Sequence, residues 1–225
     1  MSAAGNADLL LLDLAAKRWP GGQSLLGRIR FSVSPGEVVA ISGPSGCGKS
    51  TLLSILAGLD RDFEGHVTWR GAPRVGVVFQ TPRLLPWRTA AENVALGLAG
   101  HPDGKVRARR ALAEVGLAEA AEVYPSRLSV GMAQRVAIAR ALVAEPGFLL
   151  LDEAFASLDE AAAQRVRSSI LERVEARGMS VLMVTHDPRD STAMADRLLL
   201  LGGAPTRLLE LKSLRAQVRL RRQPR

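Results

Sequence analysis

Residues 43–51 read Gly43-Pro44-Ser45-Gly46-Cys47-Gly48-Lys49-Ser50-Thr51, which matches the pattern GxxxxGK[ST] of a phosphate-binding loop. An apolar run, Val38–Ser42, precedes this loop, and a helical pattern follows it from about Lys49. The glycines let backbone N–H groups turn inward around the β- and γ-phosphates, and the helix N-terminus adds its positive dipole end. The stretch therefore predicts an α/β fold that binds a purine nucleoside triphosphate.

Two side chains of the phosphate loop have specific expected tasks. Lys49 supplies a positive charge to the phosphate oxygens, and the Ser50 hydroxyl is placed to ligate Mg²⁺. A chance glycine-rich turn is the alternative, and the strand–loop–helix context argues against it. We expect all nine residues, 43–51, to take part in nucleotide binding.

Two carboxylates end a second apolar run. Residues 148–151 are one phenylalanine and three leucines, and Asp152 and Glu153 follow directly. A buried strand of this kind delivers charge at its C-terminal end, where open α/β sheets bind ligands. We expect Asp152 to hold Mg²⁺ and Glu153 to orient and polarise the attacking water. A solvated acidic turn is the alternative, and the phosphate loop in the same chain disfavours it.

Apolar runs bounded by Gly, Pro and Ser alternate with helical patterns, which indicates one α/β domain over 1–225 with a mainly parallel sheet. Residues 148–151 and 181–185 read as buried strands, with a crossover helix between them. The apolar face of that helix is Ala163, Val166, Ile170 and Val174.

The remaining stretches predict two additions to this core. Residues from about 88 to 145 have helical patterns and no convincing strand, so we expect a helical subdomain inserted into the α/β core. Residues 1–40, 65–78 and 197–211 are expected to form short antiparallel strands.

The composition is that of a globular chain that does not itself cross a membrane. The chain has 225 residues, 47% of them hydrophobic and 23% charged, and no stretch reaches the roughly 18 apolar residues of a membrane span. The first eight residues lack the basic start and apolar run of a secretion signal. The single cysteine, Cys47, fits a reducing compartment. We expect a cytoplasmic chain whose role at a membrane depends on a partner.

The net charge of +8 is concentrated at the C-terminus, where residues 212–225 contain six basic residues and no acidic one. A solvated tail is one interpretation. Leu211, Leu214 and Val218 are spaced as on one face of a helix, so a short basic helix that touches lipid headgroups or a partner is the other. No part of the charge pattern requires nucleic acid as a partner.

Leu128-Ser129-Val130-Gly131-Met132 resembles the signature motif LSGGQ of the ATP-binding cassette (ABC) ATPases. The other motifs of that family follow in order, with Gln80 after an apolar strand, Asp159 in Ser157-Leu158-Asp159, and His186 after the run 181–185. Trp19 stands where the family places an aromatic residue that stacks on adenine, with plain packing as the alternative. The chain is identified as similar to an ABC transporter ATP-binding subunit over nearly its whole length.

The resemblance implies ATP and Mg²⁺ as ligands and a second nucleotide-binding subunit as partner. Such cassettes dimerise head to tail, with each nucleotide between one subunit's phosphate loop and the other's signature motif. Ser129 and the Gly131 N–H would contact the γ-phosphate bound to the partner, and Asp159 would shape the dimer seam. His186 would reach the γ-phosphate, and Gln80 would approach Mg²⁺ and couple the site to the membrane-spanning partner.

The stretch from Gln80 to Trp87 resembles the corresponding segment of importers for nitrate, sulfonates and taurine. The resemblance implies transmembrane permease subunits as partners, a periplasmic solute-binding protein acting through them, and a peripheral place on the cytoplasmic face of the inner membrane. We expect Leu84, Leu85 and Trp87 to form an exposed apolar anchor for the permease. Packing within the helical subdomain is the alternative.

Three departures from the family pattern stand out. Val130 stands where glycine is usual, which is costly if the site needs a positive φ and harmless otherwise. Ala154 replaces the usual proline after Glu153, and the loop that follows reads Ala156-Ser157 where Ser/Gly-Ala is commoner. These departures bear on the rate of hydrolysis more than on nucleotide binding.

Two other function classes fit the sequence less well than an importer ATPase. DNA-repair cassettes insert long coiled coils between the phosphate loop and the signature, whereas only 80 residues without heptads separate Lys49 from Ser129 here. Ribosome-acting cassettes carry two such units in one chain, whereas this chain of 225 residues has room for one. A small-molecule P-loop kinase would account for Lys49 and would leave Ser129 and His186 without a task.

Overall fold

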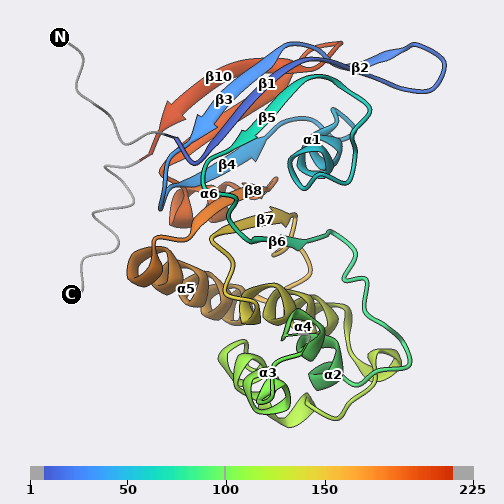
Figure 1. Cartoon of the computed structure of the whole chain (residues 1–225), viewed down its shortest axis with the longest axis vertical. Coiled ribbons are helices and arrows are strands. Elements are labelled where there is room, and N and C mark those ends of the chain that lie inside the picture. Colours follow the sequence, from blue (N-terminus) through green and yellow to red (C-terminus); the bar gives the residue numbers. More distant parts are fainter. Residues whose placement is uncertain (1–7, 99, 215–225) are drawn as a thin grey trace.

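The computed structural model describes residues 8–98 and 100–214. Its centre is a six-stranded sheet with the strand order β10-β9-β4-β8-β7-β6 (Figure 1). All neighbouring strands run parallel except the edge pair, in which β10 is antiparallel to β9. The strands are β4 (Val38–Ser42), β6 (Val75–Val78), β7 (Phe148–Asp152), β8 (Ser180–Val184), β9 (Arg197–Gly202) and β10 (Arg207–Ser213).

A second, antiparallel sheet lies above one face of the central sheet (Figure 1). Its longest strand, β1, pairs with all of the others and turns Leu10, Leu12 and Leu14 inward at alternate positions. Its strands are β1 (Leu10–Arg18), β2 (Ser24–Leu26), β3 (Ile29–Val33) and β5 (Glu64–Trp69).

The apolar core forms one cluster on each face of the central sheet. Strands β7 and β8 are buried at every position, as expected for strands covered on both faces. Phe148 and Leu150 face the cluster shared with the antiparallel sheet and α1 (Lys49–Leu56), whereas Leu149 and Leu151 face the cluster shared with the remaining helices. Consecutive residues of one strand thus join the two halves of the molecule.

The helices on the second face include a helical subdomain that follows β6. It contains α2, η1, α3, η2 and η3, and it continues into α4, which packs on β6 and on α2 and α3 (Figure 1). No described helix is long and apolar enough to span a bilayer. The helices are α2 (Ala90–Ala95), η1 (Leu96–Leu98), α3 (Gly104–Glu114), η2 (Ala118–Ala120), η3 (Pro125–Arg127), α4 (Val130–Val143), α5 (Glu160–Arg177) and α6 (Pro188–Met194).

Two strands expected to be antiparallel belong to the parallel sheet instead. In 65–78 the prediction is right for β5 and wrong for β6, which pairs parallel with β7. In 197–211 it is right for β10 and wrong for β9, which pairs parallel with β4. Short apolar strands carry no local mark of direction, because direction depends on which distant strand they meet.

Of the two interpretations of the basic C-terminal segment, the helix through Leu211 is contradicted in the part that the structure describes. Leu211 lies in β10, which pairs with β9 up to Ser213, and Leu214 packs at the edge of the core. Val218 and the rest of the basic tail lie outside the described residues.

Candidate active site

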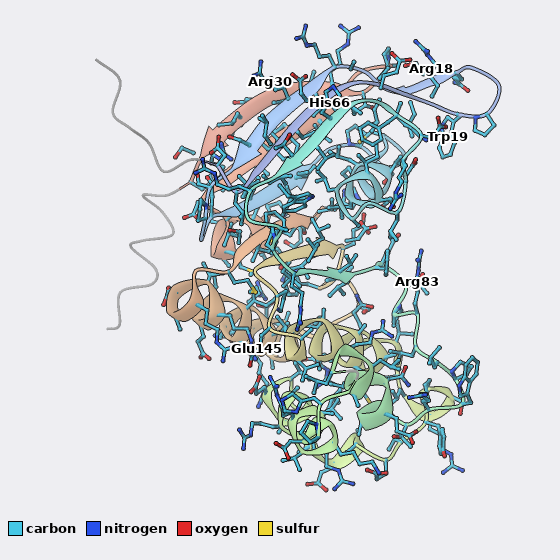
Figure 2. The ribbon with its side chains drawn as sticks, viewed as in Figure 1. Arg18, Trp19, Arg30, His66, Arg83 and Glu145 are labelled. Carbon is cyan, nitrogen blue, oxygen red and sulfur yellow. The ribbon has the colours of Figure 1, made fainter. Side chains whose placement is uncertain are left out.

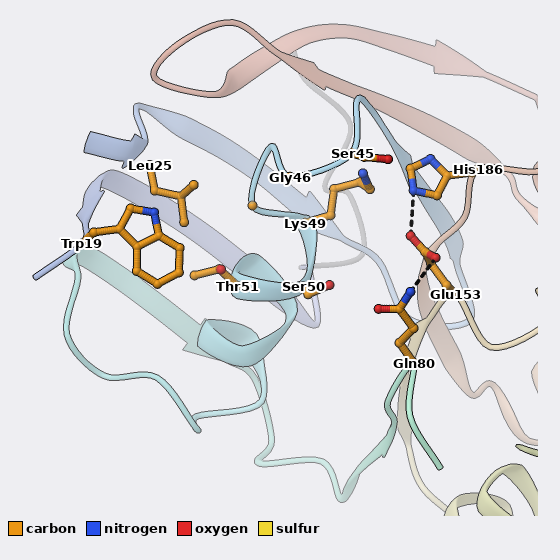
Figure 3. A pocket seen from close by; sticks show the side chains of 11 residues that line it. Trp19, Leu25, Ser45, Gly46, Lys49, Ser50, Thr51, Gln80, Glu153 and His186 are labelled. Carbon is orange, nitrogen blue, oxygen red and sulfur yellow. Dashed lines mark hydrogen bonds and ion pairs between the residues drawn. The ribbon is translucent and has the colours of Figure 1, made fainter. Parts of the chain in front are cut away.

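A cleft of about 410 Å³ opens at the C-terminal ends of the parallel strands (Figure 3). The phosphate loop follows β4, Gln80 follows β6, Glu153 follows β7 and His186 follows β8. Because parallel neighbours end at the same edge, segments far apart in sequence meet there. The cleft is lined by Trp19, Leu25, Ser45, Gly46, Gly48, Lys49, Ser50, Thr51, Gln80, Glu153 and His186.

Glycines in the phosphate loop are required by close backbone contacts. A Cβ on Gly43 would lie 2.5 Å from the Leu201 carbonyl oxygen. Gly48 has a φ of 94° and would place a Cβ 2.6 Å from Leu26 Cδ2. It precedes the first residue of α1 without a capping side chain, so the first N–H groups of the helix stay available to an anion.

Lys49 is the first residue of α1, and it is 5% exposed. Its ammonium donates hydrogen bonds to the carbonyl oxygens of Gly43 at 2.9 Å and Pro44 at 2.8 Å. The loop thus holds a positive charge beside the free N–H groups of α1. Gly43, Pro44 and Cys47 do not line the cleft, and Pro44 and Cys47 border a neighbouring hollow.

Asp152 ends β7 as a buried carboxylate. Burial raises its pKa, an effect opposed by a hydrogen bond from Ser50 and the charge of Lys49. Its Oδ1 atom is buried and has no hydrogen-bond partner in the described part of the chain. An unpaired buried carboxylate oxygen next to a serine hydroxyl is a donor set that suits Mg²⁺.

The rest of the site also fits Mg²⁺ better than a metal held by side chains alone. Within residues 8–98 and 100–214 no group of three or more His, Cys, Asp or Glu side chains could hold a metal ion. Mg²⁺ is usually bound by one or two protein ligands together with substrate phosphates and water, so Ser50 and Asp152 suffice for it.

Glu153 is held by contacts to both of its carboxylate oxygens (Figure 3). His186 Nε2 lies 2.6 Å from Oε1, and Gln80 Nε2 donates to Oε2 at 3.0 Å. The backbone of Glu153 has a φ of 48°, a strained conformation for a residue other than glycine. Strain of roughly 1–3 kcal/mol persists where surrounding structure imposes it, commonly at active sites.

His186 lies on a turn that is fixed from the side of α5. The Asp187 N–H donates to Thr185 Oγ1 at 3.1 Å, and Thr185 Oγ1 donates to Asp190 Oδ2 at 2.9 Å. Asp190 in turn lies 3.5 Å from a guanidinium nitrogen of Arg167 on α5. The position of the imidazole therefore depends on this buried polar chain.

Trp19 lies at the opposite end of the cleft from Glu153 (Figure 3) and is 50% exposed. Leu25 on β2 lies beside it and lines the same end of the cleft. Sequence reasoning missed Leu25, because a three-residue strand has too little periodicity to mark its exposed face. The two apolar side chains offer a surface for a planar ring.

The predicted signature residues and Asp159 do not line this cleft. Ser129 is the N-cap residue of α4, and its Oγ accepts a hydrogen bond from the Met132 N–H at 3.2 Å. A Cβ on Gly131 would lie 2.7 Å from the Ser157 carbonyl oxygen, so only glycine fits there. Asp159 is the N-cap residue of α5, and its side chain accepts a hydrogen bond from the Ala162 N–H at 2.9 Å.

The substitution at Val130 is harmless to the backbone. Val130 is the first residue of α4 and does not have a positive φ, so a β-branched residue is tolerated. Its side chain is 70% exposed beside Ser129.

The predicted apolar anchor at 84–87 is only partly exposed. Leu84 packs against the core of the helical side and Leu85 is half-buried, so the prediction is wrong for Leu84. Trp87 is 70% exposed and is the main apolar group of this surface.

Comparison with protein families supports the assignment suggested by this geometry. A family model described as ABC transporter matches residues 26–156. An aliphatic sulfonates import ATP-binding protein of Burkholderia cenocepacia is 47% identical over 207 residues, which cover 88% of this chain and 76% of that protein. A protein of the same description from Pseudomonas aeruginosa is 45% identical, with 87% and 83% covered.

Solved structures of ABC proteins superpose on this chain over most of its length. The dimeric, post-hydrolysis ATP-binding cassette MJ0796 bound to ADP and Pi superposes with a TM-score of 0.84 at 29% identity, covering 92% of this chain and 99% of that one. An inward-facing transporter described as a putative metal-chelate type ABC transporter gives 0.77 at 26% identity, with 93% and 85% covered.

These matches confirm the predicted fold class, an ABC ATPase core with a mainly parallel sheet, an antiparallel β subdomain and an inserted helical subdomain. They also confirm the predicted family and enzymatic activity, ATP hydrolysis. The chain belongs to the ABC transporter family and is one of its ATP-hydrolysing subunits.

Proposed function

We propose that this chain powers an importer for aliphatic sulfonates, within the nitrate, sulfonate and taurine class of small anionic solutes. The observation that carries the ATPase part is the convergence of the phosphate loop, Gln80, Glu153 and His186 on one cleft. The solute class rests on relatives that are named aliphatic sulfonates import ATP-binding proteins and are 42–49% identical to this chain.

Binding of ATP is assigned to the phosphate loop and the Trp19 end of the cleft. The α1 N–H groups and Lys49 bind the β- and γ-phosphates. The ribose then lies between the phosphate loop and the end of the cleft that Trp19 and Leu25 line. Adenine stacks on Trp19 against Leu25. Ser50 and Asp152, with Gln80 nearby, hold Mg²⁺, which when bound neutralises charge on the phosphates.

Hydrolysis is assigned to the three side chains at the other end. Glu153 orients the attacking water and polarises it by accepting a hydrogen bond from it. His186 reaches the γ-phosphate, and Gln80 approaches the Mg²⁺ site. Gln80 and His186 each contact one oxygen of Glu153, and each of these oxygens keeps a second lone pair that can accept a hydrogen bond from water.

A second nucleotide-binding subunit completes each site. Ser129 and the Gly131 N–H lie at the exposed N-terminus of α4, away from the cleft of their own chain, which suits contact with the γ-phosphate of a head-to-tail partner. Asp159 lies near that surface because Ser157 contacts Gly131. Dimeric cassettes among the structural relatives support this arrangement.

The chain acts as a peripheral subunit on the cytoplasmic face of the inner membrane, where Trp87 contacts transmembrane permease subunits. A periplasmic solute-binding protein delivers the solute and acts on this chain only through the permease. The relatives' description as import ATP-binding proteins supports these partners.

The test is reconstitution of the complex. The tagged chain is purified from membranes together with its permease, placed in proteoliposomes, and assayed with the solute-binding protein. Ethanesulfonate should stimulate ATP hydrolysis and should be imported, and nitrate should do neither to the same extent. Hydrolysis stimulated by nucleic acid and insensitive to every small anion would contradict the proposal.

A further inference from the structure

Residues 79–88 connect β6 to α2 without forming a helix or strand, and we call them the connecting segment. Gln80 near its start reaches Glu153. Figure 2 shows Arg83 on this connection, between the sheet half and the helical half of the molecule. Such a segment needs partners for its main-chain polar groups, since buried or half-buried N–H and C=O groups are rarely left unpaired.

Three side chains of the helical side supply those partners. On α4, Gln134 Nε2 donates to the Phe79 carbonyl oxygen at 3.1 Å. Also on α4, Arg140 donates from Nη2 to the Pro82 carbonyl oxygen at 2.8 Å and from Nη1 to that of Arg83 at 2.9 Å. These bonds bracket Gln80 on both sides.

Asn93 on α2 holds the later part of the segment. It accepts from the Leu85 N–H at 2.8 Å and donates to the carbonyl oxygens of Leu85 at 3.1 Å and Arg88 at 3.0 Å. Asn93 is fully buried, so these bonds are shielded from water. The backbone of the connecting segment is therefore attached to α2 and α4 rather than to the core.

Arg140 is the strongest of these attachments. Its guanidinium is charged, which makes its two hydrogen bonds stronger than neutral ones, and burial lowers its pKa without removing the charge. Arg83 has a φ of 47° and its guanidinium lies 3.8 Å from the centre of the Phe79 ring. A strained residue of this kind persists because its surroundings hold it in place.

The two ends of α4 lie at different sites of the molecule. Its 14 residues, from Val130 to Val143, span about 21 Å at 1.5 Å per residue. Ser129 and Gly131 stand at the first end, and Arg140 stands near the second. Glu153, in contrast, is positioned by β7 and by the Val184 carbonyl, to which its N–H donates at 3.0 Å.

We infer that Arg140 is a positioning residue that ties Gln80 to α4, so that the contact between Gln80 and Glu153 depends on where α4 lies. The inference rests on the proposed function, because it is there that Gln80 acts in hydrolysis and that Ser129 meets the partner's nucleotide.

The test compares two arginines of the same helix by steady-state ATP hydrolysis of the purified full chain. Arg140→Met removes the two bonds to the connecting segment. Arg135→Met is the matched control, because Arg135 donates to two carbonyl oxygens within the helical subdomain, those of Val115 at 3.1 Å and Gly116 at 3.3 Å. The thermal unfolding midpoint of each variant is also measured, so that a loss of stability can be distinguished from a loss of activity.

Arg140→Met should lower kcat by roughly tenfold or more while changing the KM for ATP by less than about threefold, since only orientation in the cleft is lost. Arg140→Lys should restore part of kcat because one donor remains. Arg135→Met should keep kcat near wild type. Equal loss of kcat in Arg135→Met and Arg140→Met would overturn the inference, as would unchanged kcat in Arg140→Met.

A double-mutant cycle with Gln80→Ala separates positioning from general damage. If Arg140 acts through Gln80, adding Arg140→Met to Gln80→Ala should lower kcat by no more than about twofold further. Independent, multiplying losses would overturn the inference. These measurements need only ATP hydrolysis, so they test Arg140 whichever solute the importer carries, whereas failure of sulfonate import would count against the proposed function alone.

Discussion

Glu153 combines several properties expected of a catalytic carboxylate. It follows a fully buried strand, has a strained backbone with a φ of 48°, and contacts Gln80 and His186 through separate oxygens. Asp152 beside it differs, because it is buried, has a raised pKa and keeps an unpaired oxygen. Two adjacent acids therefore have different environments, which suits one to bind a cation and the other to act on water.

Glu153→Gln should retain ATP affinity and lose nearly all turnover. Phosphate binding uses Lys49 and backbone N–H groups, whereas a neutral amide cannot polarise water as a carboxylate does. The expected loss in kcat is about 100-fold or more. Steady-state hydrolysis and equilibrium ATP binding measure the two effects.

Glu153→Gln should elute as an ATP-bound dimer in size-exclusion chromatography, because ATP hydrolysis no longer triggers dissociation of the dimer. Lys49→Ala is the contrasting control and should lose ATP binding itself. Turnover at the wild-type rate in Glu153→Gln would remove Glu153 from its catalytic role.

At the scale of elements, α4 and α5 join the helical side of the molecule to the core. Glu145, just after α4, contributes to this junction (Figure 2). It lies 2.9 Å from a guanidinium nitrogen of Arg107 on α3 and 3.2 Å from one of Arg177 on α5. A single carboxylate thus connects helices from both sides of the junction.

Glu145→Gln should make the stability of the chain less dependent on acid pH. The hydrogen bond from Arg177 lowers the pKa of Glu145, opposed by desolvation and helped by the charges of Arg177, Arg107 and Arg173. A lowered folded-state pKa adds stability above the unfolded-state pKa, and that stability is lost as the pH falls through the folded-state value. Half of the Glu145 side chain is exposed, so the contribution at pH 7 is only about 0.5–1 kcal/mol.

Urea unfolding of wild type and Glu145→Gln at a series of pH values measures this effect. The difference in unfolding free energy should be present at pH 7 and vanish once the pH falls well below about 4, where both side chains are neutral. Glu119→Gln, on an exposed turn of the same subdomain, is the control that changes the charge alone. A difference that persists unchanged at low pH would contradict the ion-pair explanation.

At the scale of the whole molecule, the nucleotide cleft is separate from the Trp87 surface that we propose binds the permease. The cleft lies at the C-terminal ends of the parallel strands, and Trp87 lies in the segment just before α2, a helix of the helical half. Both surfaces are reached from the connecting segment, which starts next to Gln80 and ends next to Trp87.

Trp87→Ala should weaken association with the permease and spare the chemistry of the isolated chain. A large exposed aromatic residue is the type of group that dominates interfaces, so we expect a loss of about 2 kcal/mol or more in binding. Basal ATP hydrolysis should stay near wild type. Co-purification with the permease and titration of the complex measure the change.

Leu209→Ala provides the comparison for Trp87→Ala, because Leu209 is 67% exposed on β10 at the opposite end of the molecule. It should leave the complex intact. Co-purification that is unaffected by Trp87→Ala would show that this surface does not bind the permease.

Much of the site could be predicted from sequence because its parts are continuous in the chain. Residues 43–51 and the pair Asp152 and Glu153 are consecutive in the chain, and the apolar runs before them identify strands. The phosphate loop needs its glycines for local reasons, so its pattern survives in the sequence. Fold class and family follow from the same local patterns.

Only the tertiary structure decided what depends on distant contacts. It placed β6 and β9 in the parallel sheet, packed the half-buried Leu84 against the core, and added Leu25 to the cleft. It also joined Gln80 to Glu153 and Arg140 to the connecting segment, across 73 and 57–58 residues of chain. Hydrophobic spacing reports which face of an element is buried, whereas pairing partners and side-chain contacts are set when the elements pack together.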